Sequence, residues 1–212
     1  MLTVVFDASP LITACKFESQ GKLVIDHLLP GCCIVISSSV EEEVAVLGAG
    51  YPDGVVAGER IVQGVIHVEP VTARKWARHL ADYALGNGEK DSIGLCSQVE
   101  EVEALVTDDY LAFVAATRLG LKAWMLPDLV LELAERGSLT IEVAEAILKV
   151  IHPRYRVGVI EYSLVRLQEV KQDAESRGAG QGGDSASSGA SQGGGGGGRH
   201  RPVSGRADQP GF

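Results

Sequence analysis

Short runs of apolar residues alternate along the chain with longer segments whose apolar positions recur at helical spacing. The short runs predict buried strands over residues 2–6, 33–36, 65–68, 104–106 and 121–124. The longer segments predict helices that begin near residues 9 and 37, and helices over 21–29, 72–85, 89–99, 110–119, 127–136, 140–150 and 159–171. Strands that alternate with helices are typical of a helix-covered sheet, so we expect an α/β fold with roughly four to five mostly parallel strands.

Local signals predict where two helices start and where one loop lies. Ser9 followed by Pro10 is typical of an N-cap and a first helical residue. Ser39 and Glu42 have the spacing of a capping box. Residues 48–58 are rich in glycine and contain a proline, which predicts a loop.

The predicted elements divide the chain into three parts. The last three helices have no strand between them, which indicates an α/β domain over residues 1–125 and a helical extension over 126–177 packed on it. Residues 178–212 form a Gly/Ser-rich tail that holds half of the 26 glycines. Such a segment buries too little apolar surface to offset the entropy of ordering, so we expect a disordered tail. Its terminal arginines leave two alternatives, a solvated tail or a weak RNA-contacting arm.

The chain of 212 residues has a formal net charge of −9. The tail carries more arginines than aspartates, so the acidic excess lies in residues 1–177. An acidic domain argues against broad nonspecific binding to duplex nucleic acid. It does not exclude a nuclease, because bound metal ions would cancel part of the negative charge.

Cysteine spacing and the lack of targeting signals predict the compartment. The four cysteines, Cys15, Cys32, Cys33 and Cys96, include no Cys-x-x-Cys pair, which argues against a zinc site and favours reduced thiols. The chain opens on a predicted strand, without a basic region followed by an apolar stretch. We therefore expect a cytoplasmic protein without a membrane partner.

Acidic residues follow two of the predicted strands directly. Asp7 ends the run over residues 2–6, and Asp108 and Asp109 follow the run over 104–106. Ligands of open α/β sheets bind in the crevice at the carboxyl ends of the strands, so these carboxylates are expected to converge. Carboxylates without a lysine or arginine among them repel one another unless a divalent cation neutralises them, and hard oxygen ligands suit Mg²⁺ or Mn²⁺. The pattern therefore predicts metal-assisted chemistry on a phosphate.

Four short segments carry a resemblance to a known family. They are Val5-Phe6-Asp7-Ala8-Ser9, Ser39-Val40-Glu41-Glu42-Glu43, Asp91-Ser92-Ile93 and Val106-Thr107-Asp108-Asp109. In this order and context they resemble the motifs of the PIN-domain ribonucleases, which include the toxin half of VapBC toxin–antitoxin pairs. The resemblance covers about residues 2–125. The pair Gly88-Glu89 and the helices after Trp124 are more similar to a PIN subgroup with a helical C-terminal extension than to the shortest toxins.

The resemblance implies a PIN-like fold and a metal-dependent endoribonuclease that hydrolyses RNA phosphodiester bonds with Mg²⁺ or Mn²⁺. The catalytic residues that it implies are Asp7, Glu43, Asp91 and Asp109, and the metal ligands are Asp7, Asp91, Asp108 and Asp109. The secondary candidates are Ser9, Glu42, Glu89 and Thr107. It implies RNA as substrate and, for a toxin, an antitoxin as partner. The amphipathic segment 72–85 could form a homodimer face, although burial within the same chain is the more ordinary outcome.

Several of these residues have a structural alternative to a functional role. Glu42 competes with Glu43 for the same site, because both lie in one acidic helical turn. Glu89 is also a favourable charge in the first turn of a helix, and it points to a different side from Asp91. One of the two acids at 108 and 109 is expected to bind or orient metal, and the other to cap the next helix. The hydroxyl groups of Ser9 and Thr107 could hydrogen-bond an acid or a phosphate. A purely structural role, as a helix N-cap or at the end of a strand, is equally compatible with the sequence.

The sequence is also compatible with two rival classes of protein. Asp7 at a strand end is compatible with an aspartyl-phosphate enzyme, but haloacid-dehalogenase-like enzymes usually have an acid two residues later, where this chain has Ser9. The second rival is a PIN-like scaffold that binds RNA or protein without cutting. The intact acid set argues against it, since an inactive site commonly loses metal ligands.

Overall fold

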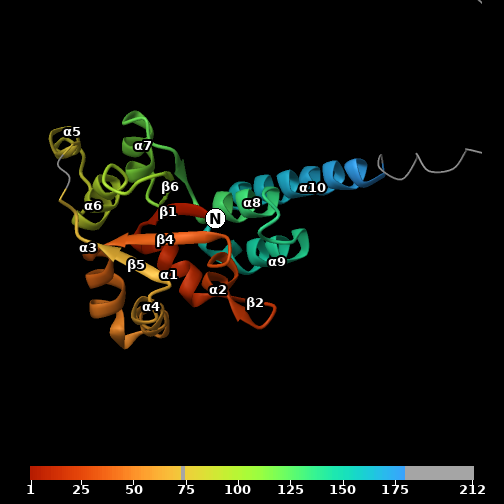
Figure 1. The fold of residues 1–212 in the computed structure, drawn as a ribbon, viewed down its shortest axis with the longest axis horizontal. Coiled ribbons are helices and arrows are strands. Elements are labelled where there is room, and N and C mark those ends of the chain that lie inside the picture. Colours follow the sequence, from red (N-terminus) through yellow and green to blue (C-terminus); the bar gives the residue numbers. More distant parts are fainter. Residues whose placement is uncertain (73–74, 180–212) are drawn as a thin grey trace, which may run out of the picture.

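The computed structural model describes residues 1–72 and 75–179, which contain a five-stranded sheet in the order β5-β4-β1-β6-β7 (Figure 1). Its strands are β1 (Leu2–Phe6), β4 (Cys32–Ser37), β5 (Ile66–Glu69), β6 (Val102–Val106) and β7 (Ala123–Trp124). All pairings in this sheet are parallel. The α/β class and the central parallel sheet that the sequence predicts are confirmed.

Helices connect the strands and then continue beyond the sheet. They are α1 (Ala8–Lys16), α2 (Val24–Leu28), α3 (Ser38–Glu41), α4 (Pro52–Val62), α5 (Ala77–Ala81), α6 (Asn87–Leu95), α7 (Tyr110–Arg118), α8 (Leu126–Glu135), α9 (Ile141–Ile151) and α10 (Val157–Ala179). A π-helix, Glu42–Val46, extends α3, and short 3-10 helices follow at Leu47–Gly50 and His152–Arg154. A two-stranded hairpin, β2 (Glu18–Ser19) with β3 (Lys22–Leu23), lies outside the main sheet.

Strand β1 lies at the centre of the sheet because its side chains are apolar toward both faces. Val4 and Phe6 are fully buried in a core that includes residues of α1, α2, α4 and α8 to α10. Val5 is fully buried in a second core with residues of α5, α6 and α7. In Figure 1, α6 and α7 lie above the sheet and α1 and α4 below it. A parallel sheet covered on both faces requires such an uninterrupted apolar run.

The C-terminal helices share the larger core with the sheet. Their fully buried members in this core include Leu126, Leu129, Leu133, Ile147, Leu148 and Ile151. The end of α10 extends away from the sheet (Figure 1). The predicted helical extension is therefore present, and its apolar residues complete the core that begins with β1. The predicted tail, from residue 180 onward, lies outside the described residues.

The loop predicted over residues 48–58 is wrong, because most of it belongs to helix α4. Pro52 occupies the first turn, where its missing N–H costs no hydrogen bond. Gly54 lies so close to the carbonyl groups of Val44 and Gly48 that a Cβ atom would overlap them. Glycine at 54 therefore permits close packing of α4 against the preceding helical turns. A high glycine content alone does not tell such a closely packed helix from a loop.

Two further helix predictions are wrong in extent. Within residues 72–85, the described residues are α-helical at Ala77–Ala81 alone. The segment 21–29 divides into strand β3 and helix α2. Gln20 and Gly21 have φ values of 52° and 77°, which make the tight turn between β2 and β3 before the helix starts.

The two predicted caps are also wrong by a short distance along the chain. Asp7, rather than Ser9, occupies the N-cap position of α1. Ser37, rather than Ser39, caps α3, since its hydroxyl accepts a hydrogen bond from the backbone N–H of Val40 at 3.2 Å. Asp7 lies between β1 and α1, and Ser37 is the last residue of β4, directly before α3. The parallel pairing of β1 with β4 places both residues at the same edge of the sheet.

The cysteines and the lengths of the helices can both be read directly from the described residues. All four cysteines are free thiols, and burial raises the pKa values of Cys15, Cys32 and Cys96 to about 12. Among residues 1–72 and 75–179, no helix is both long and apolar enough to cross a membrane.

Candidate active site

The candidate site begins where β1 and β6 end side by side. The chain moves from β1 outward to β4 and β5, and then returns to the other side of β1 with β6 and β7. The sheet order therefore reverses between β1 and β6, and this is the position where open α/β sheets bind ligands. Asp7 and Thr107 are the first residues beyond these two strands, and the N–H of Asp7 donates to the carbonyl of Val106 at 2.9 Å.

Asp7 is a buried carboxylate without a cationic partner among the described ion pairs. Burial raises its pKa to about 6, and the negative charges of Glu89 and Glu43 add to this effect. The hydroxyl of Thr107, which donates to Oδ2 of Asp7 at 2.8 Å, and the N–H of Ala8 both lower the pKa. The net effect is a carboxyl group that a bound cation would stabilise strongly in its charged form.

Glu43 reaches this edge from the π-helix Glu42–Val46, within the segment that follows β4. π-Helical turns are rare and are frequently found at functional sites. Its Oε2 lies against Gly88, where an added Cβ atom would be 3.3 Å away. Gly88 thus leaves room for the Glu43 carboxylate beside the first turn of α6. Glu42 is exposed at the start of the same π-helix, and the structure gives it no contact with Asp7.

Helix α6 presents its two acids in different directions, as their spacing predicts. Glu89 folds back over Gly86, the N-cap position of α6, and its charge acts on Asp7. Asp91 accepts a short hydrogen bond from the hydroxyl of Ser39 in α3 and lines a separate cavity. Of these two candidates, Glu89 is the one whose charge acts on Asp7, whereas Asp91 contacts Ser39.

The two acids that follow β6 also separate. Asp109 is the N-cap of α7, and its Oδ1 accepts a hydrogen bond from the N–H of Ala112 at 2.7 Å. Asp108 accepts a hydrogen bond from the hydroxyl of Tyr155 at 2.8 Å. Its Oδ1 is buried and makes no hydrogen bond of ordinary geometry to the described residues. One acid therefore caps a helix, as expected for one of the pair, and the other faces the C-terminal helices.

Burial raises the pKa of Asp108, while the Tyr155 hydroxyl and the nearby Leu126 N–H, Arg154 and Ser9 lower it. Ser9 is half-buried in the first turn of α1, so its predicted contact with an acid is to Asp108 and not to Asp7. Tyr155 is a residue that the sequence did not indicate. It lies more than forty positions beyond Asp108 (47 in sequence number), after a 3-10 turn, and no motif marks it.

The carboxylate oxygens of these acids are ligands that Mg²⁺ and Mn²⁺ prefer, but the acids do not converge on a single metal position. No group of three or more His, Cys, Asp and Glu side chains in residues 1–72 and 75–179 is arranged to hold an ion. Asp7, Glu43 and Glu89 nonetheless supply carboxylate oxygens at one edge, and none of the three is in a described ion pair. Rotation of the two glutamate side chains, which are long and at least partly exposed, would bring these oxygens toward Asp7.

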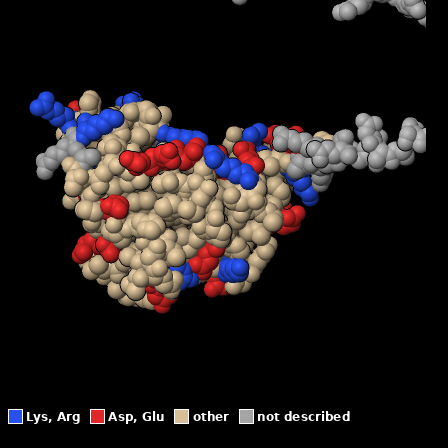
Figure 2. All heavy atoms as spheres, in the orientation of Figure 1, with Lys and Arg blue, Asp and Glu red and all other residues tan. Residues whose placement is uncertain are grey.

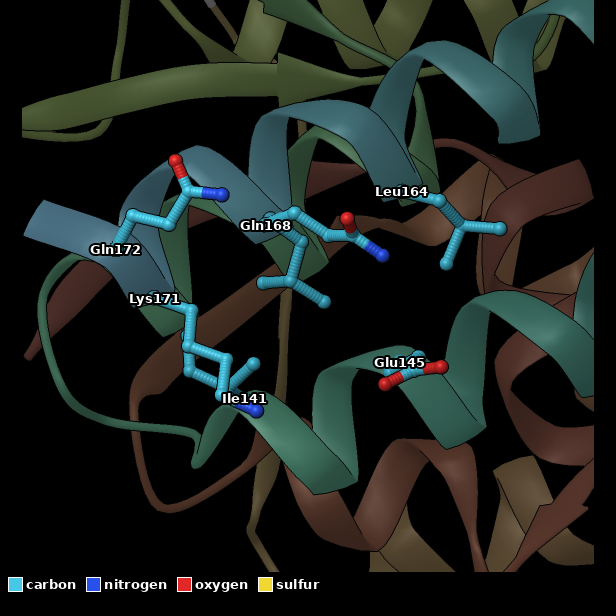
Figure 3. A pocket seen from close by; sticks show the side chains of 7 residues that line it. Ile141, Glu145, Leu164, Gln168, Lys171 and Gln172 are labelled. Atoms are coloured by element: carbon cyan, nitrogen blue, oxygen red, sulfur yellow. The ribbon is translucent and has the colours of Figure 1, made fainter. Parts of the chain in front are cut away.

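Charged side chains and a cavity can also be located outside this edge of the sheet. The face in Figure 2 is largely uncharged in its middle, with acidic and basic side chains gathered along its edges. A cavity of about 320 Å³ lies between α9 and α10. Figure 3 shows that Leu164 and Gln168 of α10 face Glu145 of α9 across it. No predicted site residue lines it.

Comparison with known proteins identifies the family. A family model described as a PIN domain matches residues 3–171. The chain therefore belongs to the PIN-domain family, whose members are generally nucleases and typically use divalent metal ions. The match extends through the C-terminal helices to within α10.

A solved structure of a domain of a functionally unknown protein from Methanocaldococcus jannaschii DSM 2661 is similar to this chain. The two share 17% sequence identity over 59% of this chain and 91% of that one, with a TM-score of 0.39. No curated protein matches the chain.

Proposed function

We propose that this protein is a divalent-metal-dependent ribonuclease that hydrolyses phosphodiester bonds in RNA. The observation that carries the proposal is the state of Asp7. This carboxylate is 4% exposed, lies at the reversal point of a parallel sheet, and faces two further acids with no cation beside it. A protein gains nothing in stability from such an arrangement, so the arrangement is better explained by binding.

The residues that would hold the metal ion are Asp7, Glu43 and Glu89, because the charges of both glutamates act on Asp7. A bound Mg²⁺ or Mn²⁺ ion would supply a water molecule of lowered pKa for attack on the phosphate. Thr107 holds the Asp7 carboxylate in one orientation. Gly88 keeps the space that the Glu43 carboxylate occupies. Burial of Asp7 excludes bulk water from its side of the site.

Cleavage and metal binding should be tested together. Purified protein is incubated with a pool of single-stranded RNA in Mn²⁺, Mg²⁺ or EDTA, and its melting temperature is measured under the same conditions. We expect the parent protein to cut RNA only when Mn²⁺ or Mg²⁺ is present, and we expect the metal to raise its melting temperature. Asp7→Asn should neither cut RNA nor show this rise in melting temperature. Asp173→Asn is the matched control, because Asp173 is an exposed acid on α10, and this variant should behave as the parent.

Two other outcomes have distinct meanings. A metal-induced rise in melting temperature without cutting of any RNA would favour the non-catalytic scaffold that binds RNA or protein. Cutting that persists in EDTA and in Asp7→Asn would contradict the proposed site.

The toxin role in a toxin–antitoxin pair is a narrower part of the same proposal. It is supported by the family and by the acid set at the sheet edge. A toxin is expected to arrest the growth of a bacterial host when expressed, and Asp7→Asn is expected to relieve the arrest without lowering the amount of protein. Normal growth at full expression of a protein that cuts RNA in vitro would contradict the toxin role alone.

A further inference from the structure

A second cavity lies beside the acid cluster formed by Asp7, Glu43 and Glu89, and it shares helix α6 with that cluster. This cavity has a volume of about 380 Å³, which falls within the usual range of small-ligand sites. Its walls include Val71, Trp76, Leu80, Lys90, Asp91 and Gly94. Glu89 belongs to the acid cluster, whereas the next two residues of the helix, Lys90 and Asp91, line this cavity. The two features are therefore adjacent.

The walls of the cavity combine three kinds of contact. Trp76 supplies an indole ring, and the buried Leu80 supplies an apolar surface. Lys90 supplies an ammonium group that is in no described ion pair, and Asp91 supplies a carboxylate. A nucleobase attached to phosphate would match these walls: its flat faces would contact the apolar surface, its phosphate the ammonium group, and a donor on its edge the carboxylate.

The carboxylate of Asp91 is oriented by a neighbour outside the cavity. The hydroxyl of Ser39 donates to Oδ2, which leaves Oδ1 of Asp91 as the acceptor for a ligand. A fixed carboxylate accepts hydrogen bonds from the amino group of a base such as cytosine, and it repels the carbonyl oxygen that uracil carries at the same position. The acceptor therefore provides a physical basis for discrimination between bases.

A cation lies over the aromatic ring of this cavity. The Nζ atom of Lys75 lies 4.8 Å from the centre of the Trp76 ring. In a chain with a net charge of −9, binding of RNA through its phosphates alone would be weak. Stacking of a base on an aromatic ring adds affinity that does not depend on the overall charge of the protein.

We propose that the cavity between α5 and α6 is a subsite for one unpaired nucleobase that carries an amino group, which stacks on Trp76 and donates to Asp91. This subsite rests on the proposed function, because it would hold a nucleotide next to the one at the acid cluster. It assigns to Asp91 a role in recognising the substrate.

Binding in EDTA, where no cleavage occurs, tests the subsite separately from catalysis. The chain has two tryptophans, Trp76 and the buried Trp124. Addition of short oligocytidylate is expected to quench the fluorescence of the full-length protein, and Trp76→Phe, which keeps Trp124, is expected to lose this quenching. By anisotropy of a labelled oligonucleotide, oligocytidylate should bind about tenfold more tightly than oligouridylate.

Two variants make the proposal falsifiable. Asp91→Asn should reduce the preference for oligocytidylate to about threefold or less, since an amide can donate as well as accept. Trp76→Ala should weaken the binding of both oligonucleotides by about tenfold, and circular dichroism should show both variants folded. Equal binding of the two oligonucleotides by the parent, or an unchanged preference in Asp91→Asn, would overturn the subsite. Base-selective binding by a protein that never cuts RNA would instead overturn the proposed function and leave the subsite intact.

Discussion

The hydroxyl of Thr107 donates a hydrogen bond to the carboxylate of Asp7 across 100 positions of sequence, at a distance of 2.8 Å. Both residues are buried, and each is the first residue after a central strand. The contact therefore joins the ends of β1 and β6 at the point where the sheet order reverses. It also holds the acid on which the proposed function depends.

Replacement of Thr107 by valine is expected to shift the pH dependence of metal binding. Valine has nearly the same shape but no donor, so the pKa of Asp7 should rise above its present value of about 6. A hydrogen bond to a charged group contributes about 1.5–3 kcal/mol, which corresponds to a shift of roughly one to two pH units. The metal-induced rise in melting temperature, measured against pH, should move upward by this amount. A profile that coincides with the parent's would show that Thr107 does not control Asp7.

Asp7 should make the metal-free protein less stable as the pH rises. Its pKa is about 6 in the folded protein and near 3.8 when exposed, so the folded state retains the proton between these values while the unfolded state has lost it. The free energy of unfolding therefore falls as the pH increases through this window. The loss attributable to Asp7 is on the order of 3 kcal/mol.

Urea unfolding in EDTA at pH values on either side of this window checks the effect. Asp7→Asn, which mimics the protonated form, should remove this part of the pH dependence and should be more stable than the parent at neutral pH. Other buried acids, such as Asp108, titrate in both proteins, so the difference between parent and variant isolates Asp7. A variant less stable than the parent at neutral pH would contradict the burial of an unpaired charge.

The two acids of α6 should respond differently to neutralisation. Glu89→Gln should raise the metal concentration needed for stabilisation by roughly tenfold or more, because its charge acts on Asp7. Asp91→Asn should leave this concentration nearly unchanged, because Asp91 contacts Ser39 and the neighbouring cavity. Thermal melting against metal concentration compares the two variants directly. A larger effect of Asp91→Asn than of Glu89→Gln would favour Asp91 as a metal ligand, as the sequence motif implies.

The hydrogen bond between Tyr155 and Asp108 should contribute to folding. Tyr155→Phe removes the donor and leaves Asp108 with less compensation for its burial, so the free energy of unfolding at neutral pH should fall by about 1–3 kcal/mol. In the Asp108→Asn background the same change should cost less, since no buried charge remains. A double-mutant cycle by chemical denaturation measures this coupling. Additive effects would show that the two side chains do not interact in solution.

Much of the fold follows from local sequence patterns. In the run over residues 2–6, Val4, Val5 and Phe6 place apolar side chains on both faces, so a buried central strand is its physical outcome. The helices over 110–119 and 127–136 are amphipathic and well delimited, and they form close to these bounds. The helix in the segment 48–58 could not be predicted from local patterns. Gly54 is needed there because the backbone packs closely against the carbonyl of Gly48, and this contact exists only after the chain has folded.

The sequence alone determined that acids follow two strands, and that these strands run parallel, since short apolar runs separated by helices have few other ways to bury both faces. It could not determine which acids converge. Glu89 and Asp91 are two residues apart on one helix, and only the packing of α6 against α3 and β1 decides that Glu89 faces Asp7 while Asp91 meets Ser39. Asp108 likewise turns toward Tyr155 because the C-terminal helices pack on the same core as β1. Local spacing fixes the direction of a side chain relative to its own helix, whereas tertiary packing fixes where that helix points.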